Sequence, residues 1–362
     1  TETITDMPGN DPITLLLSKR TADGHGSGNT RLEGAEYTVK YYDTLSDTDP
    51  AQTGSTAKYK WVFKTDANGR IRLTSDYLVS GSDGLIVNTA GRYTLPLGTI
   101  TIQESKAPEG YLINDTIYIA QTKLDTNIVV TTNLPTDDKA AQETPYEGTI
   151  SIQKFLGGSN AVKASEPDAE FQIYLKSAGS YDASPEDSRQ TITTDANGYA
   201  ITKRLPYGTY TIHQTKGNNK YYFIDDIDVT ISDNNANYHK ILENTPIEFY
   251  LKMVKKDADT GNTVNVVGAT FELYDENGSK VSFKTMTSAG VQTFDSFTTN
   301  ENGCVYTLEK LLKGNYTLVE TKAPEGYVLD STPVSFTVSE NTYTEDGGTE
   351  IVVVEKADKA VT

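Results

Sequence analysis

The residues of this 362-residue sequence that could do chemistry include three lysines, each near the end of a strand-like segment. Lys19, Lys154 and Lys255 continue the alternation of the apolar residues before them. Those apolar residues are Ile13, Leu15 and Leu17, then Ile150 and Ile152, then Phe249, Leu251 and Met253. Because successive side chains of a strand point to opposite faces, the alternation directs the three lysines into the protein interior. A buried amine is costly, so each lysine requires a compensating partner.

Two further kinds of segment place polar residues that could be these partners. A segment that begins at a glycine ends, again in alternation with apolar residues, at Glu104, Gln214 or Glu320. A last segment ends at Asn133, Asn244 or Glu355. An interior that brings Lys, Glu and Asn together lowers the pKa of the lysine and raises that of the glutamic acid, because burial disfavours both charged forms. A neutral amine can then lie beside a protonated acid near neutral pH.

Such a group of residues can form an amide bond between two side chains. The amine attacks the carboxamide carbon of Asn, while the glutamic acid polarises its carbonyl and passes protons as ammonia leaves. The fold supplies proximity, which contributes roughly 7 to 11 kcal/mol towards lowering the barrier. The reaction requires no cofactor and no second enzyme. It happens once per site, so the chain is not expected to be an enzyme.

The segments that carry these residues recur three times in the same order, which indicates three repeats of one unit. The turns between them recur as well: TDANG begins at Thr65 and at Thr194, and TNENG begins at Thr299. Val, Ile, Thr, Tyr and Phe alternate between Asn-Gly and Pro-Gly turns, a pattern typical of antiparallel strands, and helical periodicity is hard to find. The sequence therefore predicts an all-β chain of three small β-sandwich modules.

The repeats also set the predicted boundaries. Modules 1, 2 and 3 are expected at residues 11–135, 146–245 and 246–362, and residues 1–10 are a tail or the end of a preceding module. Residues 136–145, TDDKAAQETP, lack strand patterning and predict an exposed linker about which module 1 can pivot. Residues 43–92 are expected to be an insertion in module 1. Its Trp61 either caps the core or, as loops often do, contributes to a binding surface.

The composition excludes several classes of function. Lys and Arg number 32 against 50 Asp and Glu, and the net charge of -18 opposes binding to nucleic acid or to anionic lipid. No apolar run is long enough to insert into a membrane. The single cysteine, Cys304, cannot form a disulfide within the chain, and His25, His213 and His239 are scattered, so no metal site is expected.

These motifs resemble those of a known family. The lysine strand, the GAEY and GATF boxes from Gly34 and Gly268, and the SKAPEGY and TKAPEGY boxes from Ser105 and Thr321 are similar to the collagen-adhesin B-type (Cna B-type, SpaA-like) domains of Gram-positive adhesins and pilins. The resemblance implies tandem prealbumin-like or immunoglobulin-like β-sandwiches. It also implies that the first-strand lysine bonds to an Asn or Asp of the last strand, helped by the box glutamate.

Module 1 matches the family pattern fully, with Lys19 bonded to Asn133 and Glu104 as the proton shuttle. In module 2, Lys154 and Asn244 are in place, but Gln214 occupies the acid position and an amide cannot shuttle a proton. The nearest alternative acid, Glu170, alternates with buried positions and is expected to face solvent.

Module 3 departs from the pattern in another way. Lys255 and Glu320 are present, but Glu355 stands where the family has Asn or Asp. Either Glu355 forms an ion pair with Lys255, or the register differs by a residue or two.

The predicted function is architectural. We expect a stalk segment of a cell-wall-anchored adhesin or ancillary pilin, at the bacterial surface, in which Lys–Asn bonds protect the modules against shear and proteolysis. No YPK-like pilin motif is found in the sequence, which favours a stalk or ancillary subunit over a backbone pilin. The expected partners are other modules of the same surface protein, sortase-linked pilin subunits, or host matrix or glycan. The alternative function is host binding through the insertion in module 1 and Trp61.

Overall fold

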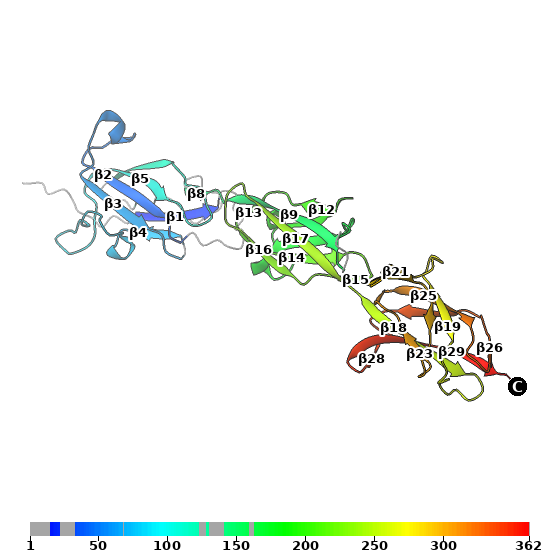
Figure 1. Cartoon of the computed structure of the whole chain (residues 1–362). Helices are drawn as coiled ribbons and strands as arrows, with labels where there is room; N and C mark the ends of the chain where they lie inside the picture. The colour runs from blue at the N-terminus through cyan, green and yellow to red at the C-terminus, as the bar shows by residue number, and fades with distance from the viewer. Residues whose placement is uncertain are drawn as a thin grey trace, which may run out of the picture.

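The computed structural model describes residues 15–21, 33–67, 69–122, 128–129, 141–158 and 163–361, and it describes β1, β7 and β8 by their backbone alone. Three β modules follow one another along an extended chain (Figure 1). Apart from four short 3-10 helices, the elements of the described residues are strands, so the prediction of an all-β fold in tandem sandwiches is confirmed.

Module 1 contains two sheets. The strands of the first sheet, in the order β3-β2-β5-β6, are β3 (Tyr59–Lys64), β2 (Glu36–Tyr42), β5 (Gly98–Lys106) and β6 (Ile117–Thr122). The strands of the second are β4 (Arg70–Arg72), β1 (Leu15–Thr21) and β7 (Ile128–Val129), with β8 (Ala141–Glu143) also paired to β1. The loops hold the short helices η1 (Pro50–Thr53) and η2 (Ser75–Tyr77).

Module 2 repeats this arrangement. Its first sheet, in the order β11-β10-β14-β16, contains β11 (Arg189–Thr193), β10 (Glu170–Leu175), β14 (Gly208–Lys216) and β16 (Ile227–Ile231). Its second sheet contains β12 (Tyr199–Ile201), β9 (Glu147–Leu156), β17 (Asn237–Pro246) and β15 (Tyr221–Tyr222), with β13 (Leu205–Pro206) paired to β9. The helices η3 (Lys176–Ala178) and η4 (Glu186–Ser188) lie between β10 and β11.

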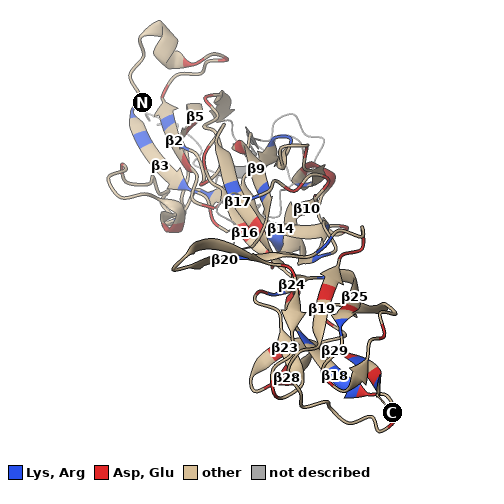
Figure 2. Ribbon diagram, turned by 45° about the vertical axis from the view of Figure 1, so that its right-hand side comes forward, with Lys and Arg blue, Asp and Glu red and all other residues tan. Residues whose placement is uncertain are grey.

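Module 3 repeats it again, with a longer last strand. Its first sheet, in the order β22-β19-β25-β27, contains β22 (Phe297–Thr298), β19 (Thr270–Tyr274), β25 (Gly314–Lys322) and β27 (Val334–Val338). Its second sheet contains β23 (Cys304–Tyr306), β18 (Glu248–Asp257), β29 (Thr349–Ala360) and β26 (Tyr327–Val328), with β24 (Leu311–Leu312) on β18 and β28 (Thr344–Asp346) on β29. A separate hairpin consists of β20 (Phe283–Thr287) and β21 (Gly290–Phe294), and it projects from the module (Figure 2).

The structure changes two of the predicted boundaries, those of the insertion and of the linker. Strands β3 and β4 lie inside the predicted insertion 43–92, yet they occupy the same places in module 1 as β11 and β12 do in module 2. The connection between β4 and β5, residues 73–97, is the one that is much longer than its counterpart in module 2. Strand β8 lies inside the predicted linker 136–145 and pairs with β1, so this part of the segment belongs to the sheet of module 1. A short polar strand such as Ala141–Glu143 carries too little alternation to be recognised from sequence.

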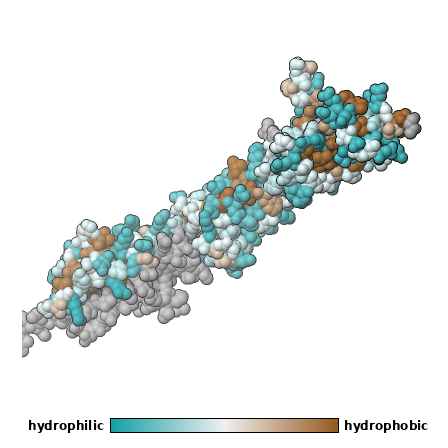
Figure 3. Space-filling model, turned by 90° about the horizontal axis from the view of Figure 1, so that it is seen from below, coloured by the Kyte–Doolittle hydropathy of each residue, from teal (hydrophilic) through white to brown (hydrophobic). Residues whose placement is uncertain are grey.

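Each module buries its own core. In module 1, Trp61 and Phe63 of β3 pack with Tyr37 and Val39 of β2, and both β3 side chains are fully buried. Charged residues are spread along all three modules (Figure 2), and the face seen in Figure 3 is mostly hydrophilic, with apolar residues more frequent toward one end. No helix among the described residues is long and apolar enough to cross a membrane.

The core of module 1 allows a selective stability test. Replacing Phe63 with Ala is expected to lower the free energy of unfolding of this module by about 3 to 5 kcal/mol, because a buried aromatic side chain leaves a cavity. Trp61 is the only tryptophan, so its fluorescence during denaturant unfolding follows module 1 alone. Leu45, which is 63% exposed, provides the control, since Leu45→Ala is expected to change stability by no more than about 0.5 kcal/mol. Equal effects of the two substitutions would contradict this assignment of the core.

Candidate crosslinking sites between the first and last strands

The first and last strands of each module lie side by side and run parallel. In module 2, β9 pairs with β17 so that Lys154 is opposite Leu242, and in module 3, β18 pairs with β29 so that Lys255 is opposite Lys356. Residues two positions further along a strand face the same side of the sheet. Asn244 and Asp358 are in that position on the last strands of modules 2 and 3. The pairing therefore directs the side chains of lysine and of Asn or Asp into the same interior.

The site in module 3 consists of three ionisable side chains with no exposed surface. The Lys255 Nζ lies 2.6 Å from Oε2 of Glu320 and 2.8 Å from Oδ2 of Asp358. Glu320 comes from β25 on the opposite sheet, where it pairs with Phe271. One cation and two carboxyl groups are thus in contact inside an apolar core, an arrangement that favours a proton on one of the acids.

The pKa of Glu320 is raised to about 7, chiefly because the group is buried; the nearby Lys255 lowers this pKa, and the nearby Asp358 raises it. A glutamic acid with this pKa is partly protonated near neutral pH, so it can donate a proton as well as accept one. Its Oε1 has no hydrogen-bond partner among the described residues, which adds to the cost of the charged form.

The predicted pairing of Lys255 with Glu355 is not found in the structure. Glu355 is opposite Val254 in the parallel register, and its side chain is 57% exposed and pairs with Lys256 at 3.4 Å. Strand β29 continues beyond the expected end at Glu355 to Ala360, and this extra length brings Asp358 to the lysine. The register differs from the expected one by three residues, more than the one or two that the sequence left open.

The site in module 2 is equally enclosed and contains an acid that the sequence reasoning missed. The Lys154 Nζ lies 2.9 Å from Oε2 of Glu166, and the Asn244 Nδ2 donates to the same oxygen at 3.0 Å. All three residues are buried, and the Lys154 Nζ also donates to the carbonyl of Phe155 at 3.0 Å. Burial lowers the pKa of Lys154, although Glu166 partly offsets this effect.

Gln214 does occupy the position of the box glutamate, but its contacts give it a structural role. It pairs with Phe171, as Glu104 pairs with Tyr37 in module 1, and its Oε1 accepts from the Ile224 N–H at 3.2 Å. Gly217 lies against both Gln214 and Glu166, and a Cβ at this glycine would come within 2.7 Å of the Glu166 Oε1. The close backbone lets the Asn218 N–H donate to that oxygen at 2.6 Å.

Glu166 could have been found from a compensating difference between the repeats. It precedes β10 by four residues, at the place where module 3 has Val266 before β19. Module 2 thus loses the acid at the box position and gains one at a position that is apolar in module 3. Glu170, the alternative considered from sequence, instead accepts a hydrogen bond from the Thr215 hydroxyl at 2.7 Å.

In module 1 the structure describes only part of the predicted site. Glu104 is buried, and its Oε2 accepts from the Asn114 N–H at 2.7 Å. Asn133 and the side chain of Lys19 lie outside the described residues. In the backbone register, Lys19 is opposite Ala141, and the residue two positions further on is Glu143. By backbone register alone, Glu143 stands in module 1 where Asn244 and Asp358 stand in modules 2 and 3.

The structure contradicts a binding role for Trp61. Its ring is fully buried, stacks on Tyr59 with the ring centroids 5.5 Å apart, and donates from Nε1 to the Gly84 carbonyl at 3.2 Å. A side chain without exposed surface cannot contact a ligand. The core interpretation, which the sequence also allowed, accounts for these contacts.

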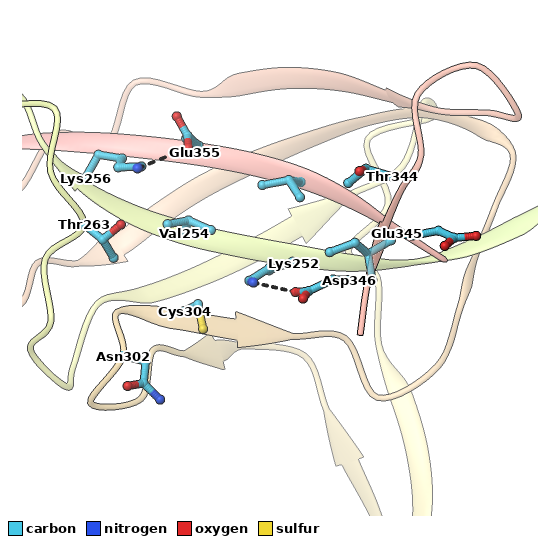
Figure 4. A pocket seen from close by; sticks show the side chains of 12 residues that line it. Lys252, Val254, Lys256, Thr263, Asn302, Cys304, Thr344, Glu345, Asp346 and Glu355 are labelled. Carbon is cyan, nitrogen blue, oxygen red and sulfur yellow. Dashed lines mark hydrogen bonds and ion pairs between the residues drawn. The ribbon is translucent and has the colours of Figure 1, made fainter. Parts of the chain in front are cut away.

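The other sequence candidates are dispersed. His213 pairs with Asp226 and His239 with Ser151, while His25 lies outside the described residues. Within the described ranges, no group of three or more His, Cys, Asp or Glu could hold a metal ion. Cys304 lines an open groove of about 460 Å³ on the outer face of module 3. Figure 4 shows its walls, where Lys252 pairs with Asp346 and Lys256 with Glu355.

The raised pKa of Glu320 predicts a pH dependence that can be measured when Lys255 is removed. In Lys255→Met the lysine no longer lowers this pKa, so folded Glu320 holds its proton at a pH where unfolded Glu320 has lost it. Stability of module 3 is therefore expected to fall, on the order of 3 kcal/mol, as the pH rises from about 5 to 7. Scanning calorimetry measures the transition, and adding Glu320→Gln should flatten its pH dependence. An equally steep dependence in the double variant would assign it to another group.

Comparisons with known proteins agree with this architecture. The family model described as SpaA, prealbumin-like fold domain, matches residues 23–135, 161–246 and 249–350. Among solved structures, the TIE protein of Bacillus anthracis is 22% identical with a TM-score of 0.52, and the match covers 96% of this chain and 50% of that one. The chain thus spans about half the length of that protein structure, which shows a similar fold.

Two further structures match at lower TM-scores. GBS52, the minor pilin of Streptococcus agalactiae, is 18% identical with a TM-score of 0.28, over 59% of this chain and 97% of that one. A variant of BcpA, the major pilin subunit of Bacillus cereus, is 16% identical with a TM-score of 0.36, over 96% and 99%. No curated protein matches the chain. Because the family model matches a segment in each of the three sandwiches, and most of the sequence in total, the chain belongs to the SpaA prealbumin-like fold domain family.

Proposed function

We propose that this chain is a structural stalk segment of a cell-wall-anchored adhesin or ancillary pilin on the surface of a Gram-positive bacterium, and that its modules are tied by amide bonds they form themselves. Family membership supports the architectural part. The observation that carries the covalent part is the contact of one Glu166 oxygen with both Lys154 and Asn244 in a buried site. With other modules of the same surface protein and linked pilin subunits as its partners, such a segment would act outside the cell.

In module 2 the shared oxygen is placed for proton transfer between two nitrogens. The neutral Lys154 amine attacks the Asn244 carboxamide carbon, and Glu166 accepts the proton that the amine loses. The same oxygen, 3.0 Å from the Asn244 Nδ2, returns the proton to the leaving nitrogen. One C–N bond forms, one C–N bond breaks, ammonia departs, and Glu166 ends in its initial state.

In module 3 the reaction is a condensation of Lys255 with Asp358. The Lys255 ammonium passes one proton to the Asp358 carboxylate, and the resulting amine attacks the Asp358 carboxyl carbon. Protonated Glu320 stabilises the developing charge, gives its proton to the leaving oxygen, and regains a proton from the attacking nitrogen. An ammonium and a carboxylate become an amide and one molecule of water. The contacts of 2.6 and 2.8 Å to the Lys255 Nζ support this assignment, since they hold the reacting groups together before any bond forms.

The bond would have a mechanical effect because of where it lies. It ties the first strand of a module to its last, and these are the strands that a pull on the chain loads first. Tension would then pass through a covalent link rather than through the hydrogen bonds of the parallel pair. The link also restricts the unfolded chain, as a disulfide does, and contributes a few kcal/mol of stability on that model. An amide is not broken by reductants.

The intact mass tests the module 3 bond. Wild-type Lys255–Asp358 condensation removes about 18 Da as water, whereas Asp358→Asn removes about 17 Da as ammonia, and both give the same amide. The two folded proteins are therefore expected to have identical masses. Without the bond they would differ by about 1 Da, because the substituted residues differ by that amount. Lys255→Ala is the control: without the lysine amine, module 3 cannot lose water or ammonia at this site.

The role of Glu166 is tested by a matched pair of substitutions. Glu166→Gln is expected to slow the loss of about 17 Da from module 2 by roughly 10²- to 10⁴-fold, since Gln cannot move the proton. Glu170→Gln changes a nearby acid that bonds to Thr215 and should leave the rate unchanged. The measurement is the time course of the Lys154–Asn244 crosslinked peptide after protein synthesis. Equal rates in the two variants would remove Glu166 from the reaction.

A further inference from the structure

The turn after the Gly-led strand has a different sequence in module 2. Modules 1 and 3 carry Ala107–Pro108 and Ala323–Pro324 there, and module 2 carries Gly217–Asn218 at the same two positions. The backbone of the turn is nevertheless alike in the three modules. The second residue of each pair accepts, at its carbonyl, a hydrogen bond of 3.1 to 3.2 Å from the N–H of the tyrosine three residues further on. The exchange therefore alters side chains and one N–H group, but not the course of the chain.

Gly217 provides space rather than an unusual backbone conformation. Its φ lies outside the left-handed region, so an alanine could adopt it. A Cβ at this position, however, would come within 2.7 Å of the Glu166 Oε1 and 2.5 Å of the Gln214 Nε2. The carboxyl group of Glu166 thus fills the space that an alanine side chain would need.

Asn218 supplies a hydrogen bond that a proline could not make. Its N–H donates to the Glu166 Oε1 at 2.6 Å, and proline has no N–H. The carboxyl group of a glutamate has no sharp rotational preference about its last bond, so such a contact decides which way each oxygen points. With Oε1 bound to the turn, Oε2 faces Lys154 at 2.9 Å and Asn244 at 3.0 Å.

The donor that binds the box acid in module 1 is already occupied in module 2. Glu104 accepts from the Asn114 N–H, and the corresponding group in module 2, the Ile224 N–H, donates to Gln214. An acid that comes from another segment therefore needs a different donor. The Asn218 N–H is that donor.

The residue four positions before the second strand changes together with the turn. It is Leu32 in module 1 and Val266 in module 3, which both have Ala-Pro in the turn. It is Glu166 in module 2, which has Gly-Asn. The chain thus combines the acid at this position with the one turn that has both the space and the N–H for its carboxyl group.

We propose that Gly217 and the Asn218 N–H position Glu166 for the reaction of Lys154 with Asn244, by holding its carboxyl group so that one oxygen faces both nitrogens. This role depends on the proposed function and adds to it two residues that do not take part in proton transfer themselves. They act through Glu166, so they are positioning residues. Ala-Pro at the same place would displace the carboxyl group and remove its donor.

Two substitutions at one position test the N–H. Asn218→Pro removes the donor in a turn that carries proline in both other modules, so the chain is expected to fold. Formation of the Lys154–Asn244 crosslinked peptide after protein synthesis should slow by roughly 10- to 100-fold, because the carboxyl group loses its orientation. Asn218→Ala keeps the N–H and is expected to retain the wild-type rate. Equal rates in the proline and alanine variants would overturn the proposal.

A double-variant comparison tests Gly217. Gly217→Ala is expected to slow the same reaction, because its Cβ has to displace the Glu166 carboxyl group or the Gln214 amide. In a chain that already carries Glu166→Gln, adding Gly217→Ala should cause no further slowing, since the glycine acts through the acid. A second loss of the same size in the double variant would show an effect unrelated to Glu166 and contradict the positioning role.

The hydrogen bond can also be measured where no amide bond can form. In an Asn244→Ala chain, adding Glu166→Ala should speed exchange of the Asn218 amide hydrogen by about 10-fold or more, whereas Glu170→Ala should not. An exchange rate that ignores Glu166 would overturn the role of the turn. A rate that responds to Glu166, together with a wild-type chain that loses no mass in module 2, would contradict the proposed reaction and not the binding of Glu166 by the turn.

Discussion

The parallel pairing of the first and last strands is the constraint on which the rest of each module depends. Parallel neighbours at the middle of a sheet bring together two residues that are far apart in sequence, such as Lys154 and Asn244, and fix the face on which both side chains lie. The opposite sheet, or the segment that leads into it, then has to supply an acid or an apolar cover. In modules 2 and 3 the cover contains a carboxyl group, so a costly buried lysine becomes part of a polar site whose members compensate one another.

Period-two alternation explains what could be predicted from the sequence. It placed Lys154, Lys255 and Glu320 correctly in the interior, because each continues a run of apolar residues on a regular strand. The all-β class and the three tandem sandwiches followed from the repeats. These features depend on local pattern alone, and pattern is preserved even when the ends of the strands are not known.

The features that were missed depend on tertiary structure. Asp358 escaped notice because β29 extends to Ala360 and the alternation Val352, Val354, Lys356, Asp358 ends in polar residues that resemble a surface strand end. Glu166 lies in a segment before β10 that has no periodicity at all. Trp61 could be assigned to the core or to a loop with equal chemical sense until the pairing of β3 with β2 showed which way it faces.

In module 2 the acid belongs to a different segment from the acid of module 3, and this affects when it can reach the lysine. Glu320 of module 3 belongs to a central strand, so it is in place as soon as the two sheets meet. Glu166 instead belongs to a connecting segment that reaches Lys154 through the bond between its own N–H and the Lys154 carbonyl at 3.0 Å. The lysine of module 2 has its acid only after this segment has closed over the strand. In the proposed reaction, the covalent closure of module 2 would therefore wait until this segment has closed over the strand.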